Sequence, residues 1–79
     1  MLTGRECAEL VRAWLAAEDF AGMRMPPEGI EMILEGVHWL DSDEPFLTER
    51  DLYRQYVWRI SWPVRMILIG RALERDRYR

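Results

Sequence analysis

The sequence contains no lysine, no asparagine, one histidine and one cysteine, and these shortages exclude several classes of protein. A single cysteine, Cys7, cannot form an intramolecular disulfide, which argues against a small secreted scaffold stapled by disulfides. No pair of histidine or cysteine residues has zinc-finger spacing. The most apolar run, residues 64–69, contains Arg65 and is far shorter than the ~20 residues of a membrane span. We therefore expect a cytoplasmic protein with no metal or cofactor and no membrane anchor.

What the chain does contain is a globular composition with an uneven distribution of charge. Its 79 residues are enough for one domain, residues 1–79, and a content of 49% hydrophobic and 32% charged residues is typical of a globular chain. All 11 basic residues are arginine, and 14 acids bring the net charge to −3. Residues 1–47 hold ten acids against three arginines, whereas residues 48–79 hold eight arginines against four acids. The acidic excess argues against a generic binder of the nucleic-acid backbone.

The first helix is predicted by a capping box and an apolar stripe. Thr3 and Glu6 have the spacing at which each side chain accepts a hydrogen bond from the other residue's backbone N–H. The apolar side chains that follow recur at helical spacing, on the face made by Cys7, Leu10, Val11, Trp14 and Leu15. We expect this helix to end near Phe20, and Gly22 is a candidate for its left-handed cap.

Further helices are predicted downstream. Pro26 and Pro27 suit a first helical turn, and apolar residues at helical spacing continue to about Leu40. Thr48 is the predicted N-cap of a third helix, residues 48–60. These elements indicate short helices joined by short loops.

Pro63 interrupts the last part of the apolar pattern. A proline inside a helix either kinks it or breaks it, and we favour a separate fourth helix, residues 62–76, that meets the third at a bend. No alternation of period two predicts a strand. The sequence therefore predicts an all-α fold, a compact three- to four-helix bundle whose last helix is kinked or broken at Pro63.

No motif for catalysis or metal binding is present. His38 lies close to several carboxylates, but the chain does not supply a set of three or four zinc ligands around it. A calcium loop starting at Asp41 would lack the glycine and the glutamate that an EF-hand needs at its sixth and twelfth positions. Cys7 falls on the apolar stripe of the first helix, where a thiol is usually inert. We expect no enzymatic activity.

Two surface features suggest binding to another macromolecule. Glu28, Glu31 and Glu35 lie on one side of the second helix, and we interpret the acidic region as a docking surface for a basic patch, with Trp39 as its apolar anchor. Asp41, Asp43 and Glu44 extend this region. The alternative for the acids is an ordinary solvated face. The alternative for the tryptophans is a satellite core formed by Trp39, Trp58 and Trp62 around Pro63.

The leading hypothesis is a non-catalytic, acidic interaction module that docks on a larger protein or nucleoprotein complex as an inhibitor or adaptor. By class alone, phage and mobile-element inhibitors such as anti-CRISPR proteins share this size, charge and lack of motifs. A second hypothesis is a nucleic-acid-binding regulator that uses Arg50, Arg54, Arg71 and Arg75. A third is a self-associating structural subunit, for example a homodimer, built on exposed tryptophans and the two-faced charge distribution.

Overall fold

The computed structural model describes residues 1–20, 22–36 and 45–77, and this part of the chain is mostly helical. Four helices, one π-helical segment and four very short strands follow one another in the described residues: β1 (Leu2–Thr3), α1 (Gly4–Ala17), β2 (Asp19–Phe20), β3 (Met23–Arg24), α2 (Pro27–Glu35), β4 (Pro45–Leu47), α3 (Glu49–Gln55), η2 (Tyr56–Ser61) and α4 (Trp62–Arg77).

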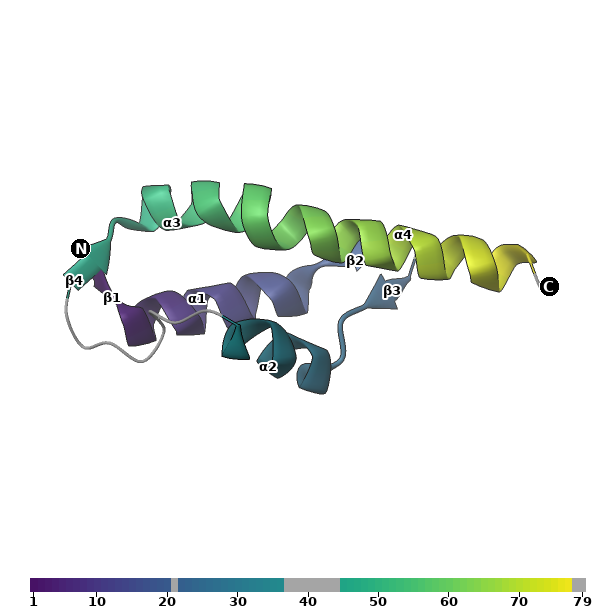
Figure 1. Cartoon of the computed structure of the whole chain (residues 1–79), viewed down its shortest axis with the longest axis horizontal. Helices are drawn as coiled ribbons and strands as arrows, with labels where there is room; N and C mark the ends of the chain where they lie inside the picture. Colours follow the sequence, from purple (N-terminus) through teal and green to yellow (C-terminus); the bar gives the residue numbers. More distant parts are fainter. Residues whose placement is uncertain (21, 37–44, 78–79) are drawn as a thin grey trace.

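The arrangement is a long rod with a shorter layer on one side. The segments α3, η2 and α4 join end to end into one continuous helix, which we call the long helix, and α1 lies alongside it (Figure 1). Helix α2 packs against α1, and the two chain termini lie at opposite ends of the molecule (Figure 1). The molecule measures 49 × 22 × 16 Å, so it is elongated. The compact bundle that we predicted from the sequence is therefore not confirmed.

Helix α1 begins as the sequence predicts. The Thr3 backbone N–H donates to Glu6 Oε1 at 3.0 Å, and the Glu6 N–H donates to Thr3 Oγ1 at 3.2 Å, which completes the capping box. Its inward face is fully buried at Cys7, Val11 and Leu15. Because these positions recur every three to four residues, one stripe of the helix meets the core.

Two short antiparallel strand pairs correct the all-α prediction. Strand β1 pairs with β4, which ties the start of the chain to the segment just before α3, and β2 pairs with β3. Helix α1 ends at Ala17 rather than near Phe20. Gly22, with φ of +81°, lies in the turn between β2 and β3 and does not cap the helix, so that prediction is also wrong. Strands of two or three residues are too short to produce an alternating pattern that the sequence could reveal.

The long helix begins at its predicted cap and continues through Pro63. The Thr48 hydroxyl accepts from the Asp51 backbone N–H at 3.2 Å. At η2 the hydrogen bonds change register, and the Trp62 N–H donates to the Val57 carbonyl five residues earlier. The break that we favoured at Pro63 is thus absent: a wider π-helical turn precedes the proline and the helix goes on to Arg77.

The π-helical turn keeps one side of the long helix against α1. Because η2 contains one residue more than an α-helix needs, the inward positions after Tyr56 are Ser61, Val64 and Leu68. In a regular α-helix they would be residues 60, 63 and 67. The core cluster combines these side chains with those of α1 and α2; its buried members are Cys7, Ala8, Val11, Leu15, Ile30, Leu34, Leu52, Tyr56, Val64 and Leu68.

Candidate functional site

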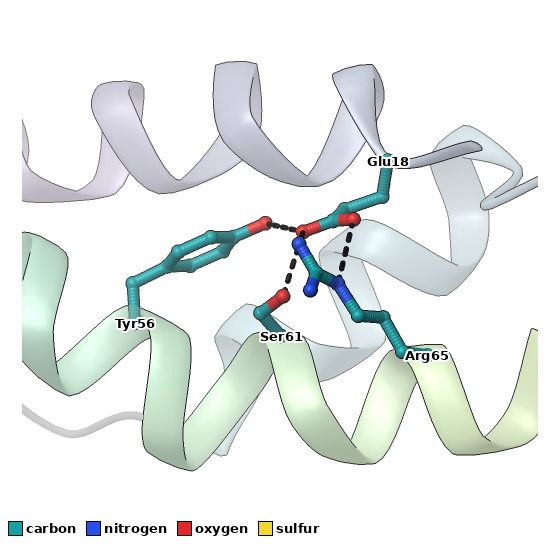
Figure 2. Close-up of polar contacts among 4 residues, drawn as sticks. All are labelled: Glu18, Tyr56, Ser61 and Arg65. Atoms are coloured by element: carbon teal, nitrogen blue, oxygen red, sulfur yellow. Dashed lines mark hydrogen bonds and ion pairs between the residues drawn. The ribbon is translucent and has the colours of Figure 1, made fainter. Parts of the chain in front are cut away.

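Among the described residues, a group of hydrogen-bonded polar side chains is centred on Glu18, the C-cap residue that follows α1. Tyr56 and Ser61 donate their hydroxyl hydrogens to Glu18 Oε1, at 2.8 and 2.7 Å. Arg65 donates from Nε to Oε2 at 3.2 Å and from Nη2 to Oε1 at 3.4 Å. Figure 2 shows all three donors rising from the long helix toward the single carboxylate. We call these four residues the Glu18 cluster.

The spacing of the donors explains why the long helix contains a π-helical turn at this place. Tyr56 and Ser61 are five residues apart, which in an α-helix would place them about 140° from each other around the axis. A π-helix bonds each residue to the one five positions away, so it places these two side chains on the same side. The turn therefore allows two neighbouring hydroxyls to reach one carboxylate oxygen.

Electrostatics keep the Glu18 carboxylate ionised. Burial acts to raise the pKa of Glu18, but the hydrogen bonds from Ser61, Tyr56 and Arg65 and the charge of Arg65 outweigh it and hold that pKa below the ordinary value. Burial, followed by the neighbouring Glu18 carboxylate, raises the pKa of Tyr56 far above its ordinary value. At neutral pH the cluster thus contains a carboxylate anion and a protonated phenol.

The Glu18 cluster lacks the properties of a catalytic group. An anion that accepts four hydrogen bonds is a weak base, and Ser61 is only 1% exposed, so a substrate cannot reach its hydroxyl. A shallow depression of about 200 Å³ lies beside the Glu18 cluster. It is lined by Trp14, Ala17, Glu18, Tyr53 and Tyr56. The three aromatic rings pack on one another, with centroids 5.2 Å apart for Trp14 and Tyr53 and 5.1 Å for Trp14 and Tyr56. The hydrogen bonds of the Glu18 cluster and these aromatic contacts hold α1 against the long helix.

The opposite side of the long helix carries a row of exposed apolar side chains. Trp58 is 72% exposed, Trp62 47%, Met66 60% and Leu73 66%. Met66 and Leu73 lie 4 and 11 residues beyond Trp62, spacings that return to one side of an α-helix. Trp58 lies about one π-helical turn before Trp62, which places it on the same side. The buried residues of the same helix, Val64, Leu68 and Ala72, face the core instead. We call the four exposed residues the outer stripe.

The sequence left two interpretations of the tryptophans open: exposed binding residues, or a satellite core around Pro63. For the described tryptophans, the exposure of the outer stripe argues against the satellite core. Trp58 and Trp62 do not pack into a satellite core, since both are exposed. Trp14 packs with the rings of Tyr53 and Tyr56. Trp39 lies outside the described residues.

The acidic residues that we predicted as a docking surface are described only in part. Glu28, Glu31 and Glu35 are exposed on α2. Glu31 Oε1 accepts from Arg12 Nε at 2.8 Å, and this ion pair lowers the pKa of Glu31. The remaining members of the predicted surface, Asp41, Asp43 and Glu44, lie outside the described residues, as does His38.

The arginines of the nucleic-acid hypothesis are exposed but widely spread. Arg50 and Arg54 lie on α3, and Arg71 and Arg75 lie on α4. Twenty-five residues of helix separate the first from the last, which corresponds to roughly 37 Å at 1.5 Å per residue. Arg75 Nε also pairs with Asp76 Oδ1 at 3.4 Å. The structure does not gather these four arginines into one patch.

Sequence reasoning missed the Glu18 cluster because Glu18 looked like one more acid in an acidic half. The apolar pattern gave no signal for it, because Ile60 and Ile67 continue the regular helical spacing from Tyr56 through the π-helical turn.

Over residues 1–20, 22–36 and 45–77, no group of three or more histidine, cysteine or acidic side chains is placed to hold a metal ion. Within the same part of the chain, no helix combines the length and the apolar character needed to cross a membrane. Comparison with protein-family models, curated proteins and solved structures gives no match.

Proposed function

We propose that this chain is a non-catalytic protein–protein interaction module that binds its partner through the outer stripe of the long helix. The outer stripe carries this proposal. Large apolar side chains that are exposed together on one side of a helix mark a candidate binding surface. Two of its four residues are tryptophan, which is enriched among the residues that dominate binding energy.

The Glu18 cluster supports the proposal because it fixes the rotation of the long helix. Glu18 holds Tyr56, Ser61 and Arg65 on the inner side, and this places the outer stripe on the side away from α1. A rigid helix face is a good binding surface because little ordering entropy is lost when a partner binds.

The reactive side chains of the described residues also favour a binding role over an enzymatic one. Cys7 is 0% exposed, and burial raises the pKa of its thiol. A buried, protonated thiol is a poor nucleophile. Ser61 is equally inaccessible and already donates its hydrogen to Glu18.

The acidic surface supports a second mode of binding, in which the module docks on a basic patch of a larger complex as an inhibitor or adaptor. Glu28 and Glu35 are exposed, and among the described residues neither takes part in an ion pair. Their charge would steer association with a basic partner and make its rate depend on salt.

Site-specific photo-crosslinking in the source cells tests the proposal. A photo-crosslinking residue at position 66 is expected to form a covalent adduct with a protein, because Met66 lies at the middle of the outer stripe. The matched control is position 32 on α2, where Met32 is 73% exposed but lies away from the stripe. Absence of any protein adduct from position 66 would refute the proposal. Adducts at position 32 that depend on Glu28 and Glu35 would favour the acidic surface instead.

A further inference from the structure

We infer that the partner of the outer stripe is a second copy of this chain, packed so that the two long helices run antiparallel about a two-fold axis at Met66. This inference rests on the proposed function, because it names the occupant of the same surface. In this register Met66 faces Met66 of the other copy, Trp62 faces Gly70, and Trp58 faces Leu73 to within one residue. The contact is isologous, the usual arrangement of a homodimer.

Gly70 is the first observation that favours a second helix at this place. A glycine inside a helix destabilises it relative to alanine. Apart from its chain neighbours and the backbone of its own helix, a Cβ at Gly70 would have no atom within 4 Å. The fold of one copy therefore does not require a glycine here. Gly70 is four residues beyond Met66 and Trp62 four residues before it, so a two-fold axis at Met66 places the largest side chain of one helix over the smallest of the other. The missing side chain lets the two helices approach closely.

The charges beside the outer stripe are the second observation. Arg59 and Glu74 are both exposed, and neither forms an ion pair within residues 1–20, 22–36 and 45–77. Within one copy they lie 15 residues apart, about 22 Å along the helix, too far for direct interaction. The two-fold axis places residue 58 of one copy opposite Glu74 of the other. Arg59 is the next residue along the chain, so it lies beside that position. The antiparallel arrangement thus pairs these opposite charges twice.

The area of the outer stripe suits a weak but specific dimer. At their observed exposures, its four side chains present on the order of 500 Å² per copy. Two copies together would bury about 1,000 Å², the lower end of the range for a specific protein interface. Such a dimer is expected to dissociate in the micromolar range.

Sedimentation equilibrium over about 1 µM to 1 mM protein tests the inference, a range that brackets the expected dissociation constant. The mass is expected to rise from one chain to two. Met66→Glu places two like charges on the axis and is expected to keep the protein monomeric, whereas Met32→Glu on α2 leaves the dimer unchanged. Far-UV circular dichroism on dilute samples checks that each variant is folded.

A charge swap tests the antiparallel register itself. Arg59→Glu and Glu74→Arg are each expected to raise the dissociation constant about fivefold, the effect of losing two exposed ion pairs. The double variant is expected to return it to near the wild-type value. Because the two residues are too far apart to interact within one copy, rescue can only occur between copies. Single effects that simply add in the double variant would overturn the register.

Gly70→Ala separates folding from association. The alanine is expected to raise the melting temperature of a dilute monomer, since it favours the helix, and to raise the dissociation constant of the dimer about tenfold, since its methyl group meets Trp62 of the other copy. An unchanged or tighter dimer would overturn the contact between Trp62 and Gly70.

Two outcomes distinguish this inference from the proposed function. A protein that stays monomeric at every concentration, yet crosslinks to a different protein from position 66, overturns the inference and leaves the proposed function standing. A monomer that forms no protein adduct but cosediments with phosphatidylglycerol vesicles overturns both, because the outer stripe would then bind lipid.

Discussion

Replacing Glu18 with alanine tests what holds the two layers of this protein together. Glu18→Ala removes the acceptor of two buried hydroxyls, on Tyr56 and Ser61, which are 3% and 1% exposed. Each buried donor left without a partner costs about 1–3 kcal/mol. Arg65, with a side chain 48% exposed, regains water and adds little. We therefore expect a loss of about 2–6 kcal/mol in the free energy of unfolding, a large part of the ~4–12 kcal/mol typical of a chain this long.

Urea denaturation followed by far-UV circular dichroism measures this loss as a lower midpoint at an unchanged slope. The matched control is Glu31→Ala, which breaks the exposed ion pair with Arg12 and is expected to leave the midpoint almost unchanged. Tyr56→Phe in the Glu18→Ala background removes one orphaned hydroxyl, so the double variant is expected to be more stable than the sum of the two single effects. A midpoint for Glu18→Ala no lower than that for Glu31→Ala would refute the reasoning.

Three further predictions follow from burial and charge. The pKa of Glu18 is lower in the folded protein than in the unfolded chain, so the ionised carboxylate stabilises the fold. This stabilisation is present above the ordinary pKa of 4.5 and is lost as the pH falls through the lower pKa of the folded state. The urea midpoints of the wild type and of Glu18→Gln should therefore converge as the pH falls. Leu68 is 0% exposed, and Leu68→Ala should lower the free energy of unfolding by about 2–5 kcal/mol, measured by urea denaturation of a dilute sample. Leu73 is 66% exposed, and Leu73→Ala should lower it much less. Equal losses of stability would contradict the assigned faces of α4. Cys7, fully buried and with a raised thiol pKa, should react with a disulfide reagent only as fast as the protein opens, and rapid labelling of the native protein would show that the core is not closed around it.

The helix starts were the most predictable part of the fold, because each depends on residues close together in the sequence. Thr3 with Glu6, and Thr48 with Asp51, form the predicted caps, and Pro27 is the first residue of α2. Cys7 is buried on the predicted stripe of α1. Capping depends on side chains that reach backbone groups two or three residues away, so the pattern is local and specific.

The features that the sequence did not reveal depend on contacts between distant segments. The β1–β4 pair joins residues about 45 positions apart, and the Glu18 cluster joins α1 to residues 38, 43 and 47 positions further on. No local pattern encodes such pairings. Proline lacks the N–H that an α-helix needs, and for this reason the sequence favoured a break at Pro63. In the structure the helix continues through Pro63, and the change of hydrogen-bond register lies just before it, in η2.

The π-helical turn also has a consequence for how this chain tolerates the loss of a residue. A shortening by one residue anywhere in a helix normally rotates everything downstream by about 100° and destroys the packing. In η2 we expect such a shortening to preserve the packing instead. Removing Trp58 would leave Tyr56 and Ser61 four positions apart, a spacing that places both on one side of an ordinary α-helix. We therefore expect the long helix to tolerate the loss of one residue within η2, and we expect Trp58, the most exposed tryptophan of the outer stripe, to be replaceable without disturbing the core.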